Sequence, residues 1–206
     1  MAPNLINIHL MQSPLHRYNL PAATKPINNS VGVWANEVPL LGYISLRGNA
    51  LQPAFIDAVH GVLGIHLPTQ ACTTQTFSNG AEILWISPDE WLICCPREQL
   101  ANLELLLKVA LTKPNSQVVN NSGGFTTVIL QGKHAIDLLQ HCTVYDIRSL
   151  KMNHVIGTTF GKMSCFIMRQ NEGYKLVFRR SFADYIWTFL VRAAEPYGFG
   201  VQKLEI

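Results

Sequence analysis

The sequence predicts an α+β protein made of two consecutive βαββαβ halves with antiparallel sheets. Apolar patterns of strand and helix type alternate from residue 41 onward, and two hairpins recur at matching places in the order. The tripeptide Leu46-Arg47-Gly48 also has a counterpart 84 residues later, Leu130-Gln131-Gly132. In both places a glycine joins a strand to a helix, where positive φ or close packing needs a small residue. We therefore expect Gly48 and Gly132 at equivalent turns.

The first residues of the chain show neither a helical nor a strand period. They carry an Asn-Asn-Ser cluster at 28–30 and five prolines: Pro3, Pro14, Pro21, Pro26 and Pro39. We expect an extended N-terminal arm over residues 1–39. The first half then covers residues 40–122 and the second half residues 123–206, and the two halves form one compact unit.

The first half opens with a strand at 41–47 and a helix that Pro53 begins and Gly64 ends. The core face of this helix is marked by Phe55, Val59, Val62 and Leu63. A hairpin joins strands 82–86 and 91–95, because Ser87-Pro88-Asp89 suits a type I turn. A leucine-rich helix follows at 99–111 and a strand at 117–121. The leucines cover so much of this helix that we expect little of it to face water.

The second half repeats this order. It begins with a strand at 125–131 and a helix at 133–141, and continues with a hairpin of strands 158–169 and 174–179. Ser181 has Asp184 three residues on and is the expected N-cap of the last helix. Pro196 ends that helix, and residues 199–203 form the closing strand. Two such halves are ferredoxin-like.

The composition excludes several classes of partner. A net charge of +3 without a Lys/Arg block argues against nucleic acid. No apolar run reaches about 18 residues, and no signal-peptide pattern opens the chain, so we expect a cytoplasmic protein without membrane contact. Only 14 per cent of residues are charged, against about 25 per cent in a typical domain, which suggests that another chain covers part of the surface.

Motifs for cofactors, metals and catalysis are missing from the sequence. No G-x-G-x-x-G opens a helix, and Gly157 to Met163 lacks the spacing and the hydroxyl of a phosphate loop. The five cysteines form no C-x-x-C pair and are expected to be buried thiols, while His134 and His141 share a helix without a ligand set. We assign no catalytic, cofactor-binding or metal-binding residue to this chain.

Two surface segments are candidates for contact with a partner. The first is the turn of Pro88, Asp89 and Glu90; the second is the pair Arg179 and Arg180 before the last helix. Loops and arginines are enriched at interfaces. The two arginines could also meet a substrate carboxylate, but solvated or interface arginines are commoner at such a place. The loop from Asn120 to Gly124 has glycines that suit either an anion site or, more often, a tight crossing between strands. Trp91, at the start of a hairpin strand, is expected to be buried.

Five segments carry a family resemblance. They are Leu46-Arg47-Gly48, Gly61-Val62-Leu63-Gly64-Ile65-His66-Leu67-Pro68, Leu84-Trp85-Ile86-Ser87-Pro88-Asp89-Glu90-Trp91-Leu92, Cys142-Thr143-Val144-Tyr145-Asp146-Ile147 and Arg179-Arg180-Ser181-Phe182-Ala183-Asp184-Tyr185-Ile186-Trp187. In these segments, which run in order from about Leu46 to Leu190, the chain resembles the gamma subunits of heterotetrameric sarcosine oxidase. Asn120 stands where that family commonly has aspartate.

The resemblance implies a fold similar to the folate-binding domains of aminomethyltransferases. It also implies a complex with alpha, beta and delta subunits that oxidatively demethylates sarcosine to glycine, produces hydrogen peroxide and passes the one-carbon unit to tetrahydrofolate. FAD, FMN, NAD, tetrahydrofolate and zinc are then expected on the partner subunits, and the gamma subunit has a structural role. The alternative is a free-standing folate-binding protein of the aminomethyltransferase type.

Overall fold

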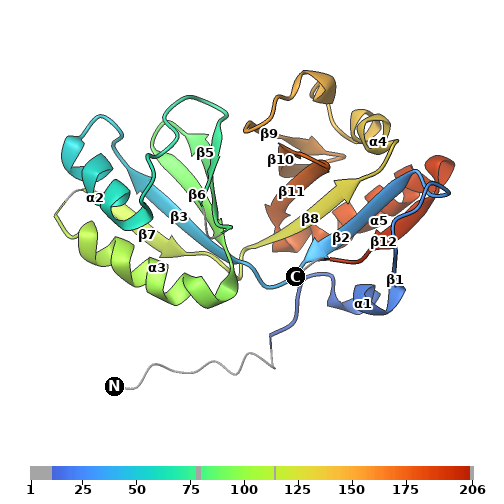
Figure 1. Cartoon of the computed structure of the whole chain (residues 1–206), viewed down its shortest axis with the longest axis horizontal. Helices are drawn as coiled ribbons and strands as arrows, with labels where there is room; N and C mark the ends of the chain where they lie inside the picture. The colour runs from blue at the N-terminus through green and yellow to red at the C-terminus, as the bar shows by residue number, and fades with distance from the viewer. Residues whose placement is uncertain (1–10, 78–79, 114, 205–206) are drawn as a thin grey trace.

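The computed structural model describes residues 11–77, 80–113 and 115–204. It shows two sheets that face each other, with helices on the outer side of each (Figure 1). One sheet has the strand order β4-β5-β6-β3-β7, and the other has the order β1-β12-β2-β8-β11-β10-β9. The predicted α+β class with two similar halves is therefore confirmed.

The first half follows the sequence prediction closely. Its elements are β3 (Gly42–Gly48), α2 (Pro53–Leu63), β4 (Thr74–Thr76), β5 (Glu82–Ser87), β6 (Glu90–Cys95), α3 (Arg97–Ala110) and β7 (Ser116–Asn120). Pro53 is the first residue of α2, and Gly64 ends the helix with a φ of 68°. Among the described residues of this half, the short strand β4 at the sheet edge is the addition to the predicted order.

The second half has the same element order. It comprises β8 (Phe125–Gln131), α4 (Ala135–Cys142), β9 (Val155–Phe160), β10 (Met163–Gln170), β11 (Gly173–Arg179), α5 (Ala183–Ala194) and β12 (Phe199–Gln202). Gly48 ends β3 and Gly132 directly follows β8, the first strand of each half. The single strand predicted at 158–169 is wrong: Gly161, with a φ of 59°, turns the chain so that β9 and β10 pair as a hairpin.

Ser181 does not cap the last helix. It lies in a 3₁₀ turn, Arg180–Phe182, whose backbone supplies the first turn of hydrogen bonds, and α5 begins after it without a side-chain cap. The Ala183 amide donates to the Arg180 carbonyl within this 3₁₀ turn, so the turn stands where the serine cap was expected.

The expected N-terminal arm is wrong over much of its length. Residues 16–25 form a 3₁₀ turn, His16–Tyr18, then α1 (Leu20–Ala23) and β1 (Thr24–Lys25). Strand β2 (Val33–Val38) is inserted between β8 and β12, antiparallel to the first and parallel to the second. In a βαββαβ unit the last strand normally pairs with the first. In the second sheet, β2 from the N-terminal segment lies between these two strands, β12 and β8. Residues 1–10 of the expected arm lie outside the described residues.

Strand β2 escaped prediction because both of its faces are buried. Without a solvent face its sequence has no alternation of apolar and polar residues. Its two polar residues are buried with partners: the Asn36 amide donates to the Gln202 carbonyl at 2.8 Å, and Glu37 accepts a 2.6 Å hydrogen bond from the Thr126 hydroxyl. The backbone amide of Leu15 also donates to the Glu37 carboxylate at 3.3 Å.

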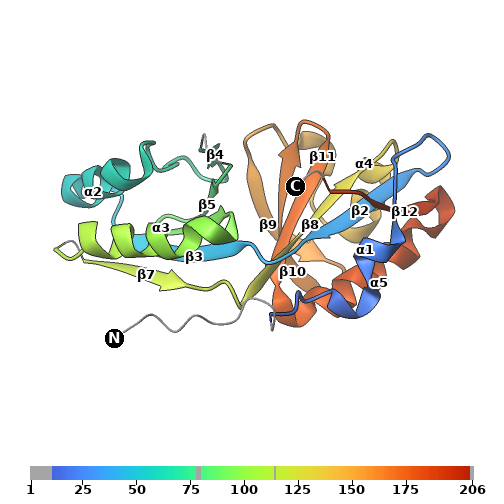
Figure 2. The same cartoon turned by 60° about the horizontal axis from the view of Figure 1, so that its bottom comes forward.

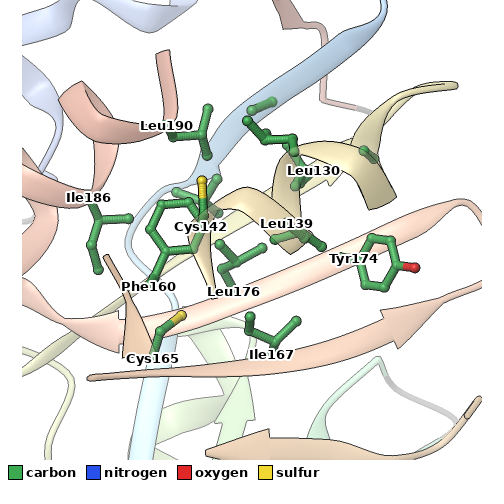
Figure 3. Packing of buried hydrophobic residues seen from close by; sticks show 14 of the residues in the cluster. Leu130, Leu139, Cys142, Phe160, Cys165, Ile167, Tyr174, Leu176, Ile186 and Leu190 are labelled. Atoms are coloured by element: carbon green, nitrogen blue, oxygen red, sulfur yellow. The ribbon is translucent and has the colours of Figure 1, made fainter. Parts of the chain in front are cut away.

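Each half has its own core between sheet and helices. Figure 3 shows part of the core of the second half, where Leu139 and Cys142 of α4 meet Leu176 and Phe160 of the sheet. Four of the five cysteines are buried as expected, and Cys72 is exposed. Cys94 and Cys95 belong to clusters on opposite faces of β6, as a strand requires.

A third cluster joins the halves. It is formed by Tyr43, Leu84, Leu92 and Cys94 of the first sheet and Phe125, Val155, Met168 and Val177 of the second. The Tyr43 and Thr127 hydroxyls are 2.6 Å apart across this junction, and Lys175 pairs with Glu82 at 2.7 Å. The chain crosses between the halves after β2 and again after β7 (Figure 2). The described parts of the two halves therefore contact each other through this cluster.

Helix α3 differs from its prediction. Leu100, Leu107 and the following Leu111 are buried, but Leu105 and Val109 keep 61 and 65 per cent of their surface exposed. The prediction that little of this helix faces water is wrong. Its leucines lie on both sides of the helix, and only one side can contact the sheet.

Candidate functional site

The candidate turn at Pro88 and Asp89 is the tight link between β5 and β6. The Ser87 hydroxyl donates to the Asp89 carboxylate at 2.7 Å, and the Asp89 carbonyl accepts from the Gly48 amide at 3.1 Å. Glu90 pairs with Arg47 at 2.7 Å across β6 and β3, and this hydrogen bond raises the pKa of the Arg47 guanidinium. Both carboxylates therefore have partners within the chain, while Pro88 and Asp89 remain exposed.

An open cleft lies beside this turn. It has a volume of about 870 Å³, and its walls include Trp85, Leu51 and Gln117 as well as Pro88 and Asp89. Leu51 is 90 per cent exposed, so an apolar side chain stands free at the rim. The mixture of an aromatic ring, an aliphatic tip and polar groups is typical of a protein contact rather than of a closed ligand pocket.

The candidate arginines lie at the junction of the two halves. The Arg179 guanidinium sits 4.5 Å from the centre of the Phe125 ring, a cation–π contact between paired strands. The Arg180 side chain donates to the Gln12 carbonyl at 3.3 Å, and its backbone amide donates to the Gly124 carbonyl at 2.9 Å. Both side chains stay exposed while they hold the N-terminal segment and the start of β8.

The structure does not bring the two candidates together. The turn lies beside Arg47 and Gly48 at the end of β3. Arg180 instead contacts Gly124, which comes shortly after Asn120, the residue paired with Ile44 near the start of β3. Six residue steps along a strand separate these ends, a distance of about 20 Å. A single small partner surface cannot use both segments as one site.

A groove of about 1040 Å³ runs between the halves. Its walls come from the link at Val38–Leu41, the start of α3 at Pro96–Glu98, and residues of β8, β11 and β12, with Lys175 of β11 and Gln202 of β12 among them. No local sequence pattern predicts this groove, because its residues come from six separate segments of the chain. Cationic and anionic groups mix along it, including Arg97, Glu98 and Lys203.

The loop from Asn120 to Gly124 is a strand crossing. The Asn120 side-chain amide nitrogen donates to the Glu104 carboxylate at 2.9 Å, and the Asn120 side-chain oxygen accepts from the Ser122 hydroxyl at 2.7 Å. A Cβ on Gly124 would lie 2.3 Å from the Asn121 side-chain oxygen, so a larger residue here would displace the Asn121 side chain. Every polar group named here is engaged inside the loop or with α3, which favours the structural interpretation.

Titratable groups do not converge on a metal-binding geometry. Among residues 11–77, 80–113 and 115–204, no group of three or more His, Cys, Asp or Glu side chains could hold a metal ion. His134 contacts Asp137 at 3.0 Å and stacks on the Tyr197 ring, which His141 also approaches. Asp137 is thus a carboxylate beside His134 that was not expected from the sequence. Burial raises the pKa of the Cys142 thiol to about 12 and that of Cys95 to about 11.

No helix in the described part of the chain is long and apolar enough to cross a membrane.

Comparison with known proteins gives a consistent result. Residues 47–195 match the family model described as sarcosine oxidase, gamma subunit family. A sarcosine oxidase subunit gamma from Corynebacterium sp. (strain P-1) is 27 per cent identical over 160 residues, which cover 76 per cent of each chain. The corresponding subunit from an Arthrobacter species is 28 per cent identical over 127 residues, or 61 per cent of this chain and 62 per cent of the relative.

Solved structures share the fold. A chain of the heterotetrameric sarcosine oxidase from Corynebacterium sp. U-96 superposes with a TM-score of 0.81 and 22 per cent identity over 96 per cent of this chain and 99 per cent of that one. The glycine cleavage system aminomethyltransferase T from Bartonella henselae has a TM-score of 0.72 and 10 per cent identity, over 94 per cent of this chain and 59 per cent of that protein. At these identities the likeness concerns the fold. The family model, which spans most of the chain, carries the assignment: this chain belongs to the sarcosine oxidase gamma subunit family.

Proposed function

We propose that this chain is the accessory gamma subunit of a heterotetrameric sarcosine oxidase, with alpha, beta and delta subunits as its partners. The observation that carries the proposal is the family match over residues 47–195, which covers both halves of the fold. The agreement in fold with a chain of a heterotetrameric sarcosine oxidase over 96 per cent of the length supports it. The role of the chain is structural.

The host complex oxidatively demethylates sarcosine to glycine, with tetrahydrofolate as the one-carbon acceptor and hydrogen peroxide as the product. FAD, FMN, NAD, tetrahydrofolate and zinc belong to the partner subunits. The turn of Pro88, Asp89 and Glu90 and the pair Arg179 and Arg180 are contact candidates on this chain. Their separation by about 20 Å along β3 requires either two partner surfaces or one extended one.

Co-expression with the other three subunits tests this function. We expect size-exclusion chromatography to recover the chain in a fraction that has flavin absorbance and oxidises sarcosine with peroxide release. The isolated chain is expected to be colourless and inactive. Elution apart from the flavin-containing fraction, or peroxide production by the isolated chain, would contradict the proposal.

A free-standing folate-binding protein is the second candidate function. The fold of aminomethyltransferase T and the groove between the halves favour it. A folate enzyme needs a carboxylate near the pterin, but the crossing loop offers Asn120, whose amide already donates to Glu104. Calorimetric titration of the isolated chain with tetrahydrofolate separates the two functions, because saturable binding without the other subunits supports only the second.

A further inference from the structure

A small pocket lies where the chain crosses between the halves. Its volume is about 220 Å³, and both crossings contribute to its walls: Leu40 and Leu41 follow β2, and Ser122 and Gly123 follow β7. The other described wall residues are Met11, Gln12, Pro14, Tyr43, Arg97, Phe125, Thr126 and Arg180. This set contains two arginines and no acidic residue, so the described walls carry positive charge only.

The two arginines of the pocket come from different halves. Arg97 is the first residue of α3, and Arg180 begins the 3₁₀ turn before α5. Arg97 is half-buried and Arg180 is exposed. Because the two side chains are far apart in sequence, only the packing of one half against the other brings them to the walls of one pocket.

Neither guanidinium has an acidic partner in the described part of the chain. Arg97 donates to the Met11 sulfur at 3.7 Å, and Arg180 donates to the Gln12 carbonyl at 3.3 Å. A thioether is a weak acceptor, and each guanidinium has five N–H donors. The described residues therefore leave most of the hydrogen-bonding capacity of both arginines unused. The half-buried charge of Arg97 is also partly removed from water, which favours an anion beside it.

The acidic residues closest to the pocket do not fill it. Glu37 contacts the wall residue Thr126 through a 2.6 Å hydrogen bond, but it is only 4 per cent exposed and is not itself in the described walls. Glu98 follows Arg97 and lines the larger groove instead. Outside the described residues, the sequence contains one acidic side chain, Glu205. The described chain thus supplies no anion to this pocket.

We propose that this pocket is a carboxylate-binding site in which Arg97 and Arg180 hold one small anion. A guanidinium matches a carboxylate in charge and shape, and binds it through paired N–H···O hydrogen bonds. This inference goes beyond the proposed function and does not rest on it, because the pocket and both arginines belong to this chain alone.

The volume of the pocket sets the size of the anion. Pockets for drug-sized ligands and cofactors span about 300 to 1000 Å³. A pocket of about 220 Å³ is smaller and suits a carboxylate with few other atoms, or the end of one acidic side chain. A free carboxylate and an acidic side chain of another subunit present the same chemistry to the two arginines.

Calorimetric titration of the isolated full chain with malonate at low salt tests the site. We expect saturable binding of one malonate per chain in the millimolar range or tighter. Malonamide is the matched control ligand, because it has a similar shape without the charge, and it should not bind. A lack of saturable malonate binding, or equal binding of malonamide, would overturn the proposal.

The variants Arg97→Gln and Arg180→Gln test the two arginines separately. Each should weaken malonate binding at least about tenfold, since each removes charged hydrogen bonds. Arg179→Gln is the matched control: it makes the same change of charge beside Arg180, but the Arg179 guanidinium lies over the Phe125 ring and outside the described walls. It should weaken binding less than about threefold. Equal losses in all three variants would mean that malonate responds to a diffuse positive field, and the pocket would be wrong.

Arg180→Lys keeps the test decisive if Arg180→Gln does not fold, because Arg180 also holds the Gln12 carbonyl. Lysine retains the charge but loses the planar fork, so malonate affinity should fall at least about threefold while thermal unfolding stays close to that of the wild type. Unchanged affinity in this variant would contradict a paired contact at Arg180.

Two further titrations identify the source of the carboxylate. Malonate binding that persists in the co-expressed complex assigns the site to a free carboxylate, whereas binding by the isolated chain that is lost in the complex assigns it to an acidic side chain of another subunit. If no complex forms, the proposed function is wrong and the result on the isolated chain stands. Malonate binding that appears only in Glu205→Gln would assign the arginines to the chain's own acid and overturn the proposal.

Discussion

The Lys175 ammonium lies 2.7 Å from the Glu82 carboxylate, and this ion pair ties β11 of one sheet to β5 of the other. Only 20 and 10 per cent of the two side chains are exposed. Lys175→Ala would leave a mostly buried carboxylate without its cation and should lower the free energy of unfolding by about 3 kcal/mol. The double variant Glu82→Gln/Lys175→Met should recover most of the loss. Urea denaturation measures both, and a loss below about 1 kcal/mol would mean that water replaces the lysine.

The insertion of β2 can be tested at Gly200, which is paired with Trp34 on the neighbouring strand. A Cβ at this position would lie 2.5 Å from the Trp34 ring, so Gly200→Ala should destabilise the chain by about 1 to 3 kcal/mol. Gly61 of α2 is the matched control, because a Cβ there has nothing within 4 Å. Gly61→Ala should stabilise the helix by about 0.5 to 1 kcal/mol. Melting temperatures that move in the same direction would contradict this packing.

Trp91 is fully buried, as the sequence predicts, and its indole donates to the Pro68 carbonyl at 2.8 Å. Its ring packs 5.8 Å from that of Phe55. Trp91→Ala should cost about 3 to 5 kcal/mol through the cavity it leaves. Trp91→Phe keeps much of the packing and should cost about 1 to 3 kcal/mol for the unpaired carbonyl. Guanidinium unfolding gives both values, and equal losses would show that the ring packing kept by phenylalanine contributes little.

The exposure of the thiols predicts their reactivity. Cys72 is exposed and the other four cysteines are buried, so a disulfide reagent should modify Cys72 rapidly in the native chain and all five thiols after denaturation. Cys72→Ser is the control and should abolish the rapid phase. Rapid modification of a second thiol in that variant would contradict the burial.

The same thiols predict a loss of stability at alkaline pH. Burial raises the pKa of Cys142 to about 12 and that of Cys95 to about 11, and it also raises the pKa of Cys94 and Cys165. An unfolded thiol ionises near pH 8.5, so the folded state holds these protons to higher pH. Their contribution is complete below about pH 8.5 and decreases above it, by up to about 1.4 kcal/mol per thiol and pH unit.

Urea unfolding near pH 8 and near pH 10 measures this slope. Cys142→Ala should be less sensitive to alkaline pH than the wild type, whatever its stability at neutral pH. An equal slope in the two proteins would show that Cys142 ionises in the folded state.

The sequence by itself determined the elements whose signals are local. Pro53 and Gly64 mark both ends of α2, and the turn at Pro88 and Asp89 fixes the hairpin that buries Trp91. These signals act over a few residues, through fixed φ angles and apolar spacing, and need no knowledge of the rest of the chain. The segments that carry the family resemblance are also short, continuous stretches of sequence. The family match over residues 47–195 confirmed the resemblance.

The tertiary structure alone decided where distant segments meet. Strand β2 pairs with residues about 90 and 165 positions away, and its burial on both faces removed the alternation that marks a strand. The same holds for the pairing of Lys175 with Glu82 and for the side of α3 that stays uncovered. Apolar periodicity says that a surface will be buried, but the choice of what covers it depends on pairing between segments far apart in sequence. Which segment covers a given apolar surface depends on the packing of the whole chain, so it cannot be predicted from any short stretch of residues.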